Sequence, residues 1–281
     1  MSKVLTIPCN LDEINRTKNK VDGFIIGIKN LSVNVNYYLD LNELEILNCI
    51  DKDIFISINK NMHNKDLKLI KELLIKLNEY NIKAVIYYDE AVLSIYNSLN
   101  LNYELCWAKE HSTTNYNTIN YWYKKGAKYS YISSDITEEE VEEIVKNSKS
   151  KLLLNLFGYL PMFVSKRHIV KNYLEYFNLK DSSRINYIEK ENKKYPIIDN
   201  EIGTQVYSNN ILNGIKSIFR LNVEYIVLNS FNIELNKFIE IIDLFKTVTK
   251  DKVEEYSNKI NNMFSNVDYG FLNTKTIYKV K

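Results

Sequence analysis

Short apolar runs recur along the whole chain, separated by longer stretches of mixed polar and apolar residues. None of these runs alternates strictly between apolar and polar positions, which is the pattern of strands buried on both faces of a parallel sheet. Eight such runs are present, at residues 4–7, 23–28, 54–58, 84–88, 103–107, 129–133, 151–157 and 225–228. The chain is therefore predicted to contain eight buried β-strands.

The stretches between the runs carry a helical period. Residues 65–81 place Leu67, Ile70, Leu74 and Leu77 on one face, and residues 233–248 carry a similar stripe. Thr137 followed three residues later by Glu140, ahead of an apolar run, is a capping box that predicts a helix start. Eight strands alternating with helices favour a (β/α)8 TIM-like barrel, with a doubly wound sheet as the alternative.

Residues 184–207 break this rhythm, because they show no helical stripe and contain several turn-forming residues. They predict a small β insertion between strands 7 and 8. The last residues, 265–281, read as a short strand-like tail that could cover one mouth of the barrel. We expect the whole chain, 1–281, to form a single barrel domain.

Composition excludes several classes of protein. Hydrophobic residues make up 45% and charged residues 26%, which are globular values. Seven Gly and three Pro are too few for a turn-rich all-β fold. The net charge of +2 gives no nucleic-acid footprint. No apolar run is long enough to span a membrane and the amino terminus turns polar too early for a signal peptide, so we expect a cytoplasmic protein without a membrane partner.

Cys9, Cys49 and Cys106 are widely spaced and odd in number, so neither a disulfide framework nor an all-cysteine metal site is expected. Three thiols on different elements cannot form the usual four-thiolate shell of an iron–sulfur cluster. We therefore predict no cofactor of that kind, and the sequence leaves open whether a divalent metal binds.

Barrel enzymes carry their working residues where strands end and the following loops begin. The fifth predicted strand is followed by Glu110 and His111, a carboxylate and an imidazole that could share acid–base work. The alternative is a pair that only fixes the loop. Thr114, a few residues further on, is a candidate substrate-binding residue in the same loop.

The seventh strand is followed by a loop that contains Ser165, Arg167 and His168. The chain has only four Arg against many Lys, so Arg167 is not explained by residue bias. It stands before a predicted helix at 169–177, whose amino terminus would favour an anion, and its planar guanidinium suits a carboxylate or phosphate. We expect Arg167 and Ser165 to bind substrate and His168 to act with Glu110 and His111. The alternative is an Arg that ties the insertion to the barrel.

Three further candidates for substrate binding stand at the ends of other strands: Asn59, Asp89 and Asp135. For each of them simple loop capping is the alternative. None of the G-x-S-x-G, H-E-x-x-H, P-loop or G-x-G-x-x-G motifs is present, so no standard catalytic template decides the chemistry.

Three segments resemble peptidase family U32, the collagenase-like peptidases. Residues 112–144, STTNYNTINYWYKKGAKYSYISSDITEEEVEEI, are similar to a Ser-Thr-rich opening, helix, Gly-Ala turn, strand and acidic helix start in that family. FGYLPMFVSKRH is similar to its loop after the next strand, and YPIIDNEIGTQVYSNNILNGI to its Gly-Thr stretch before the last barrel strand.

The resemblance implies an α/β barrel and a peptidase or hydrolase activity. It also implies a second reading, because other members of the family hydroxylate bases in tRNA or ribosomal RNA with an iron–sulfur cluster held by four cysteines. In the matching region this chain has Leu160, Pro161 and Met162 and no Cys.

Three functions stay open at this point. The first is a barrel that acts on or binds a peptide-like or anionic small molecule at its carboxyl-terminal mouth. The second is a protein of RNA-base hydroxylation that needs a partner, although the net charge gives RNA no support. The third is a non-catalytic barrel that binds a ligand or a paralogous subunit. A basic groove beside stacked tyrosines would favour the second.

Overall fold

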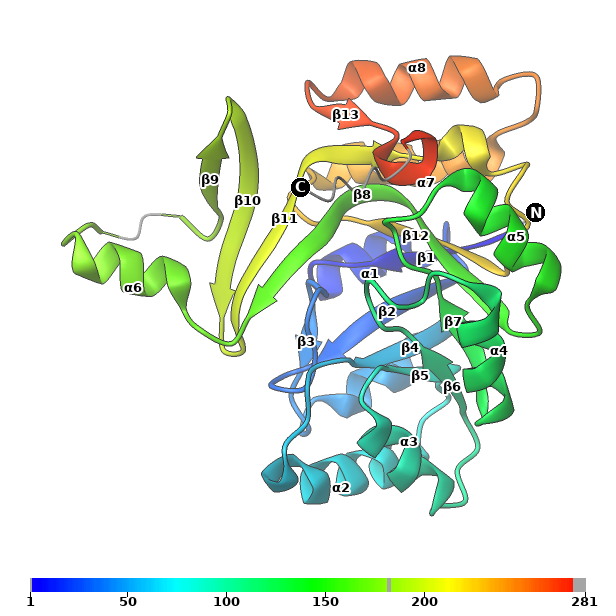
Figure 1. Cartoon of the computed structure of the whole chain (residues 1–281), viewed down its shortest axis with the longest axis vertical. Helices are drawn as coiled ribbons and strands as arrows, with labels where there is room; N and C mark the ends of the chain where they lie inside the picture. The colour runs from blue at the N-terminus through cyan, green and yellow to red at the C-terminus, as the bar shows by residue number, and fades with distance from the viewer. Residues whose placement is uncertain (1, 181–182, 275–281) are drawn as a thin grey trace, which may run out of the picture.

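The computed structural model describes residues 2–180 and 183–274, and its centre is a closed barrel of eight parallel strands (Figure 1). The strand order closes on itself because β12 pairs with both β1 and β8. The barrel strands are β1 (Lys3–Ile7), β2 (Gly23–Ile28), β4 (Asp53–Ile58), β5 (Ala84–Tyr87), β6 (Glu104–Trp107), β7 (Ala127–Tyr131), β8 (Lys151–Ser165) and β12 (Tyr225–Asn229). All eight predicted strands are present, and the predicted (β/α)8 barrel is confirmed.

In the described part of the chain, helices cover the outside of the barrel, five in the connections between barrel strands and two after β12. They are α1 (Leu11–Thr17), α2 (Leu67–Leu77), α3 (Glu90–Asn97), α4 (Tyr116–Lys124), α5 (Glu138–Asn147), α7 (Leu235–Thr247) and α8 (Val253–Met263). The capping box predicted at Thr137 is present at the start of α5, where the Thr137 and Glu140 side chains each bond to the other's backbone. Between β2 and β4 the connection is irregular, with the two-residue strand β3 (Tyr38–Leu39) and a short 3-10 helix at Leu44–Cys49 in place of an α-helix.

Alternate residues of each strand point into the barrel or out toward the helices. On β2, Ile25 belongs to the inner cluster, while Phe24 and Ile26 belong to the outer one. Since both faces are buried, the strands show apolar runs rather than clean alternation.

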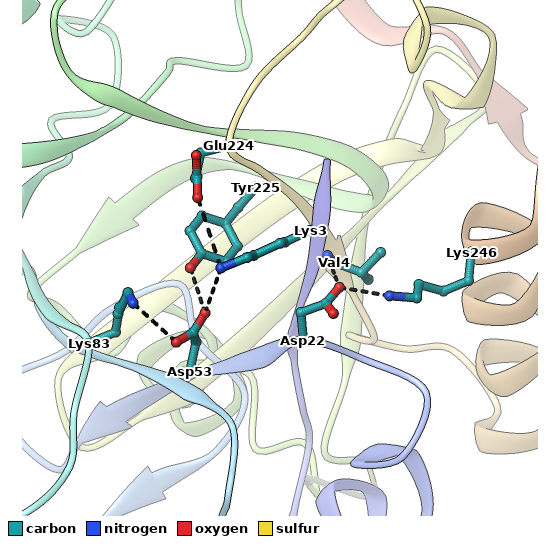
Figure 2. A network of polar contacts seen from close by, with 8 residues as sticks. All are labelled: Lys3, Val4, Asp22, Asp53, Lys83, Glu224, Tyr225 and Lys246. Carbon is teal, nitrogen blue, oxygen red and sulfur yellow. Dashed lines mark hydrogen bonds and ion pairs between the residues drawn. The ribbon is translucent and has the colours of Figure 1, made fainter. Parts of the chain in front are cut away.

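A polar network closes the amino-terminal end of the barrel (Figure 2). The Tyr225 hydroxyl donates a hydrogen bond of 2.6 Å to Asp53 Oδ2, and Lys83 and Lys3 lie 3.4 and 3.5 Å from the two oxygens of the same carboxylate. Burial works against this charge, but the hydrogen bond from Tyr225 and the two lysines outweigh it and lower the pKa of Asp53. The network joins the starts of strands β1, β4, β5 and β12 far from the opposite mouth.

β8 leaves the barrel and continues as the first strand of a long insertion. The strand leaves the barrel at Gly158, whose φ is +110°. A Cβ at this position would lie 2.4 Å from the Asn229 carbonyl oxygen of β12. Only glycine fits this position, because both the positive φ and the close backbone exclude a side chain. The sequence predicted that the strand ends at this glycine; that prediction is wrong, because β11 (Gly203–Asn213) pairs antiparallel with the outer part of β8.

The insertion also contains α6 (Ile169–Tyr176), β9 (Asn186–Lys190) and β10 (Lys193–Asn200), and β10 pairs with both β9 and β11. We call residues 161–180 and 183–207 the arm. It is longer than the predicted 184–207 insertion, and α6, β9 and β10 stand away from the barrel in Figure 1. Glu191 and Asn192 form the β9–β10 turn, both with positive φ, as a two-residue hairpin requires.

The predicted strand-like tail starts with β13 (Val267–Asp268), which lies alongside β11, and continues in a 3-10 turn at Gly270–Asn273. The remainder of that prediction, residues 275–281, lies outside the described residues. No helix in the described ranges is long and apolar enough to cross a membrane.

Candidate functional site

A cavity of about 450 Å³ opens at the carboxyl-terminal mouth of the barrel. Its floor is made by inward-facing barrel side chains such as Ile25 and Ile86. Many of its polar residues come from the loops after the strands, namely Asn34, Asn59, Glu110, His111, Ser133, Ser134 and Asp135, while Asn155 and Asn229 lie on strands β8 and β12 themselves. An apolar floor with a few convergent polar groups is the usual form of a small-molecule site.

Glu110 lies on one side of this cavity, held by Asn34 from the loop after β2. Asn34 Nδ2 donates to Glu110 Oε1 at 2.7 Å, and Asn34 N donates to Gln205 Oε1 of the arm at 2.7 Å. Water reaches Glu110 through the cavity, but protein surrounds the side chain, and this burial raises the pKa of its carboxyl. A carboxyl of raised pKa holds its proton more readily and can then donate a hydrogen bond to a ligand.

His111 and Asp135 form a hydrogen-bonded pair across two neighbouring loops. His111 Nδ1 lies 2.8 Å from Asp135 Oδ2, and the Ser133 hydroxyl donates to the other oxygen of Asp135. Burial disfavours the Asp135 carboxylate, but these hydrogen bonds outweigh it and lower its pKa. His111 also has φ +58°, a conformation uncommon for such a residue. The loop is thus held in a fixed shape that orients the imidazole at the cavity.

Two more polar contacts order the neighbouring part of the wall, on β7 and β8. The Tyr131 hydroxyl donates to Asn155 Oδ1 at 2.6 Å, and Asn155 Nδ2 donates to Ser134 Oγ at 2.8 Å. Asn59 Oδ1 accepts from Val33 N at 2.8 Å and so fixes the loop after β2. This contact with the Val33 backbone fits the alternative that Asn59 only caps a loop. The predicted role of Asn59 in substrate binding stays a prediction.

The arm and the tail complete the cavity. Pro161 and Tyr195 of the arm line it, and so do Asp268 and Phe271 of the tail, which leave the space open rather than fill it. No Lys or Arg is among the described residues that line the cavity, while three carboxyl groups are. The cavity therefore favours a neutral ligand over an anion.

The structure brings Glu110, His111, Asp135 and Asn59 together at this cavity, and it places the other candidates elsewhere. Asp89 caps α3 by accepting from Ala91 N at 3.0 Å and also accepts from Met62 N at 2.9 Å. Thr114 is half-buried outside the lining, and its neighbour Thr113 makes the loop contacts with Lys109.

Ser165, Arg167 and His168 lie on the arm and not with Glu110 and His111. The Ser165 hydroxyl accepts from Arg167 N at 3.1 Å, and His168 lines a shallow hollow between α6 and β10. The Arg167 side chain is exposed and has no side-chain partner among the described residues. It does not tie the arm to the barrel, since Asp199 bonds to Thr204 and Glu201 lies 3.9 Å from Lys29.

Several site residues were not singled out by the sequence, among them Asn155, Asn34 and Gln205. Nothing marks Asn34 in so Asn-rich a chain, but Gln205 follows the Gly-Thr pair that carried part of the family resemblance. Asn34 Oδ1 and Gln205 Nε2 are both buried without a partner among the described residues, so this corner has unused hydrogen-bonding capacity.

The cysteines do not meet at one place. Cys9 lies after β1, with its sulfur 3.3 Å from Ser230 Oγ; burial raises its pKa to about 11. Cys106 is buried on β6, and Cys49 is exposed at the end of a 3-10 helix. These residues do not fit a four-thiolate iron–sulfur shell, and the described part of the chain contains no cluster of three or more His, Cys, Asp and Glu side chains able to hold a metal.

Comparison with known proteins gives a family match over most of the chain. The family model described as peptidase family U32 matches residues 16–275. The chain is 26% identical over 250 residues to "tRNA hydroxylation protein P2" of Bacillus subtilis (strain 168), covering 80% of this chain and 81% of that protein. It is also 27% identical over 168 residues to "Uncharacterized protease MJ0090" of Methanocaldococcus jannaschii, covering 54% of this chain and 39% of that protein.

Among solved structures, the U32 peptidase Mk0906 superposes with a TM-score of 0.51 at 10% sequence identity. The match covers 82% of this chain and 92% of the other. At this identity the likeness concerns the fold alone.

Proposed function

The chain belongs to peptidase family U32, and from this premise we propose that it serves tRNA hydroxylation by binding RNA and receiving one base in the cavity at the barrel mouth. The name of the Bacillus subtilis relative, which matches over four fifths of both chains, supports this choice of substrate class.

The main support for this proposal is the polar lining of the cavity, which includes no Lys or Arg among the described residues. Amide, hydroxyl and carboxyl groups can bond to the hydrogen-bonding edge of a base, and apolar side chains pack on its faces. Asn34 with Glu110 and, further round the mouth, Asn155 with Ser134 supply donors and acceptors above the floor at Ile86. A neutral, planar base suits such a site better than a phosphate or a carboxylate.

In this proposal the chain binds the RNA substrate and does not itself insert the oxygen atom. The three cysteines, on separate elements, do not fit an iron–sulfur cluster. A partner that supplies that chemistry, such as a paralogous subunit, is part of the proposal.

The experiment compares tRNA from cells that contain or lack this chain. Nucleosides released from the tRNA are analysed by mass spectrometry for a species that carries one additional oxygen. We expect that species to disappear in the deletion, to return with the wild-type chain, and to return poorly with Glu110→Ala. A modification profile unchanged by the deletion would refute the proposal.

Hydrolysis of a peptide-like substrate is the second candidate, favoured by the His111–Asp135 pair. An imidazole oriented by a carboxylate can act as a general base toward water. A hydrolase that uses a Ser or Cys nucleophile would need a histidine bonded to it. Among the described residues, His111 bonds to Asp135 and His63 Nε2 lies 2.7 Å from Lys166 Nζ, so neither ring is bonded to a Ser or Cys. Gelatin or casein cleavage by the purified chain, abolished in His111→Ala, would establish this candidate.

A further inference from the structure

The arm carries most of the large apolar side chains that the described part of the chain leaves exposed. Nine of the fifteen such residues lie on it, although it is about a sixth of the chain: Met162, Phe163, Ile169, Tyr173, Tyr176, Phe177, Leu179, Tyr187 and Ile188. α6 has no buried residue, and Ile169, Tyr173 and Tyr176 follow one another along one face. Tyr176 is 80% exposed. This arrangement is an unpartnered aromatic face rather than part of the core.

The arm also carries a net positive charge. In the sequence, residues 161–207 contain eight Lys and Arg against six Asp and Glu, whereas the rest of the chain contains 29 of each. Among the acids, Glu201 lies 3.9 Å from Lys29 of the barrel, and Asp199 accepts hydrogen bonds from Thr204 and from the Lys171 backbone within the arm. Near the β9–β10 turn, Lys190, Lys193 and Lys194 are exposed and have no ion-pair partner among the described residues.

The arm is also connected to the barrel mouth. Tyr195 of β10 lines the cavity, and Gln205 of β11 bonds to Asn34, which in turn holds Glu110. Figure 1 shows the sheet of β8, β11 and β10 running outward from the barrel to α6 and β9. A long ligand on the arm can therefore continue into the cavity.

We propose that the arm is an RNA-binding element: its lysines and Arg167 contact the sugar–phosphate backbone, and the aromatic residues of α6 stack on unpaired bases. Aromatic platforms beside basic side chains are the means by which proteins hold single-stranded RNA. A second copy of the chain is a poorer occupant, because it would bring the same positive surface against this one. The inference rests on the proposed function and extends it from one base to its flanking nucleotides.

The test measures binding of fluorescein-labelled tRNA by anisotropy at several KCl concentrations. The arm variant is Lys190→Glu, Lys193→Glu, Lys194→Glu. The matched control, Lys124→Glu, Lys146→Glu, Lys149→Glu, has the same charge change on exposed lysines at or just beyond the ends of α4 and α5. We expect the affinity of the arm variant to fall about tenfold or more, with a salt slope reduced by about 1 for each phosphate that the variant no longer binds, and the control to bind like the wild type.

A second variant tests the aromatic face without changing charge. Tyr173→Ala with Tyr176→Ala should weaken tRNA binding by about tenfold while the salt slope stays that of the wild type, because stacking is removed and the lysines still bind the phosphates. Thermal melts of all variants should match the wild type, since the replaced side chains are exposed.

The outcomes separate this inference from the proposed function. If the wild-type chain binds tRNA and both arm variants bind it equally well, the arm inference is wrong and the proposed function stands. If the wild type binds no tRNA, the proposed function fails as well. If the tyrosine variant keeps tRNA binding but loses a protein partner or changes the oligomeric state in sedimentation, the arm is a protein-docking surface instead.

Discussion

His111 Nδ1 lies 2.8 Å from Asp135 Oδ2, although the two residues come from the loops after different strands, β6 and β7. Parallel neighbouring strands deliver their following loops to the same end of the barrel, so residues 24 positions apart meet at the cavity. The contact fixes the imidazole at the mouth.

Replacing Asp135 by Asn should loosen this loop and impair the site. Asp135 accepts hydrogen bonds from His111 and Ser133, so Asp135→Asn should lower the free energy of unfolding by about 1–3 kcal/mol, the scale of hydrogen bonds to a charged group. Urea unfolding measures the loss, and the tRNA nucleoside profile measures the effect on function. Asp268→Asn, another carboxylate of the cavity wall but without a His partner, should leave the modification intact; equal loss in both variants would argue against a special role for the pair.

Glu110 should make stability depend on pH in a specific direction. Burial raises the pKa of Glu110, so the folded chain binds this proton more tightly than the unfolded chain does. Its contribution to stability is complete below the unfolded pKa of about 4.3 and is lost as pH rises through the folded pKa. Glu110→Gln cannot ionise, so relative to the wild type it should gain stability from pH 4 to pH 8.

The gain should be about 1 kcal/mol or less, since water reaches the side chain through the cavity. Thermal melts at the two pH values measure it, with Glu79→Gln on the exposed surface as the control. A pH-independent difference between Glu110→Gln and the wild type would show that the carboxyl is not buried in this way.

The network at the closed end of the barrel predicts sensitivity to acid. The pKa of Asp53 is lowered, so the stability it contributes is present above the unfolded value near 3.9 and is lost as pH falls through the folded value. Tyr225→Phe removes the hydrogen bond to this carboxylate and should cost about 1–3 kcal/mol at neutral pH, with a smaller cost under acid. Urea unfolding at pH 7 and pH 3 tests this, and Tyr121→Phe, which changes an exposed tyrosine, should have no effect.

Gly158 and Gly126 form a matched pair for testing the departure of β8 from the barrel. Both have positive φ, +110° and +114°, so an Ala at either position should cost about 1–3 kcal/mol in backbone strain. At Gly126 the nearest atom to an added Cβ is 3.7 Å away, whereas at Gly158 it is a backbone oxygen at 2.4 Å. Gly158→Ala should therefore lose at least about 1 kcal/mol more than Gly126→Ala; equal losses in urea unfolding would mean that the strand can shift without cost.

The local pattern of the sequence determined the barrel. Apolar runs such as 23–28 and 54–58 match β2 and β4 closely, because strands buried on both faces need continuous apolar residues. The capping box at Thr137 fixed the start of α5 for a similarly local reason. Glu110, His111 and Asp135 could be expected at one mouth because the ends of parallel strands in a barrel share one face, and all three line the cavity there.

Only the tertiary structure decided where β8 ends and which candidates meet. The outer half of β8 is a strand because β11, about forty or more residues away in the chain, supplies its hydrogen-bonding partner, and no local signal encodes that pairing. The same pairing carries Arg167 and His168 away from the cavity and brings Gln205 back to Asn34. The net charge of the whole chain also gave no indication of the basic arm. A sum over the sequence cannot show which charges the fold gathers on one exposed part of the molecule.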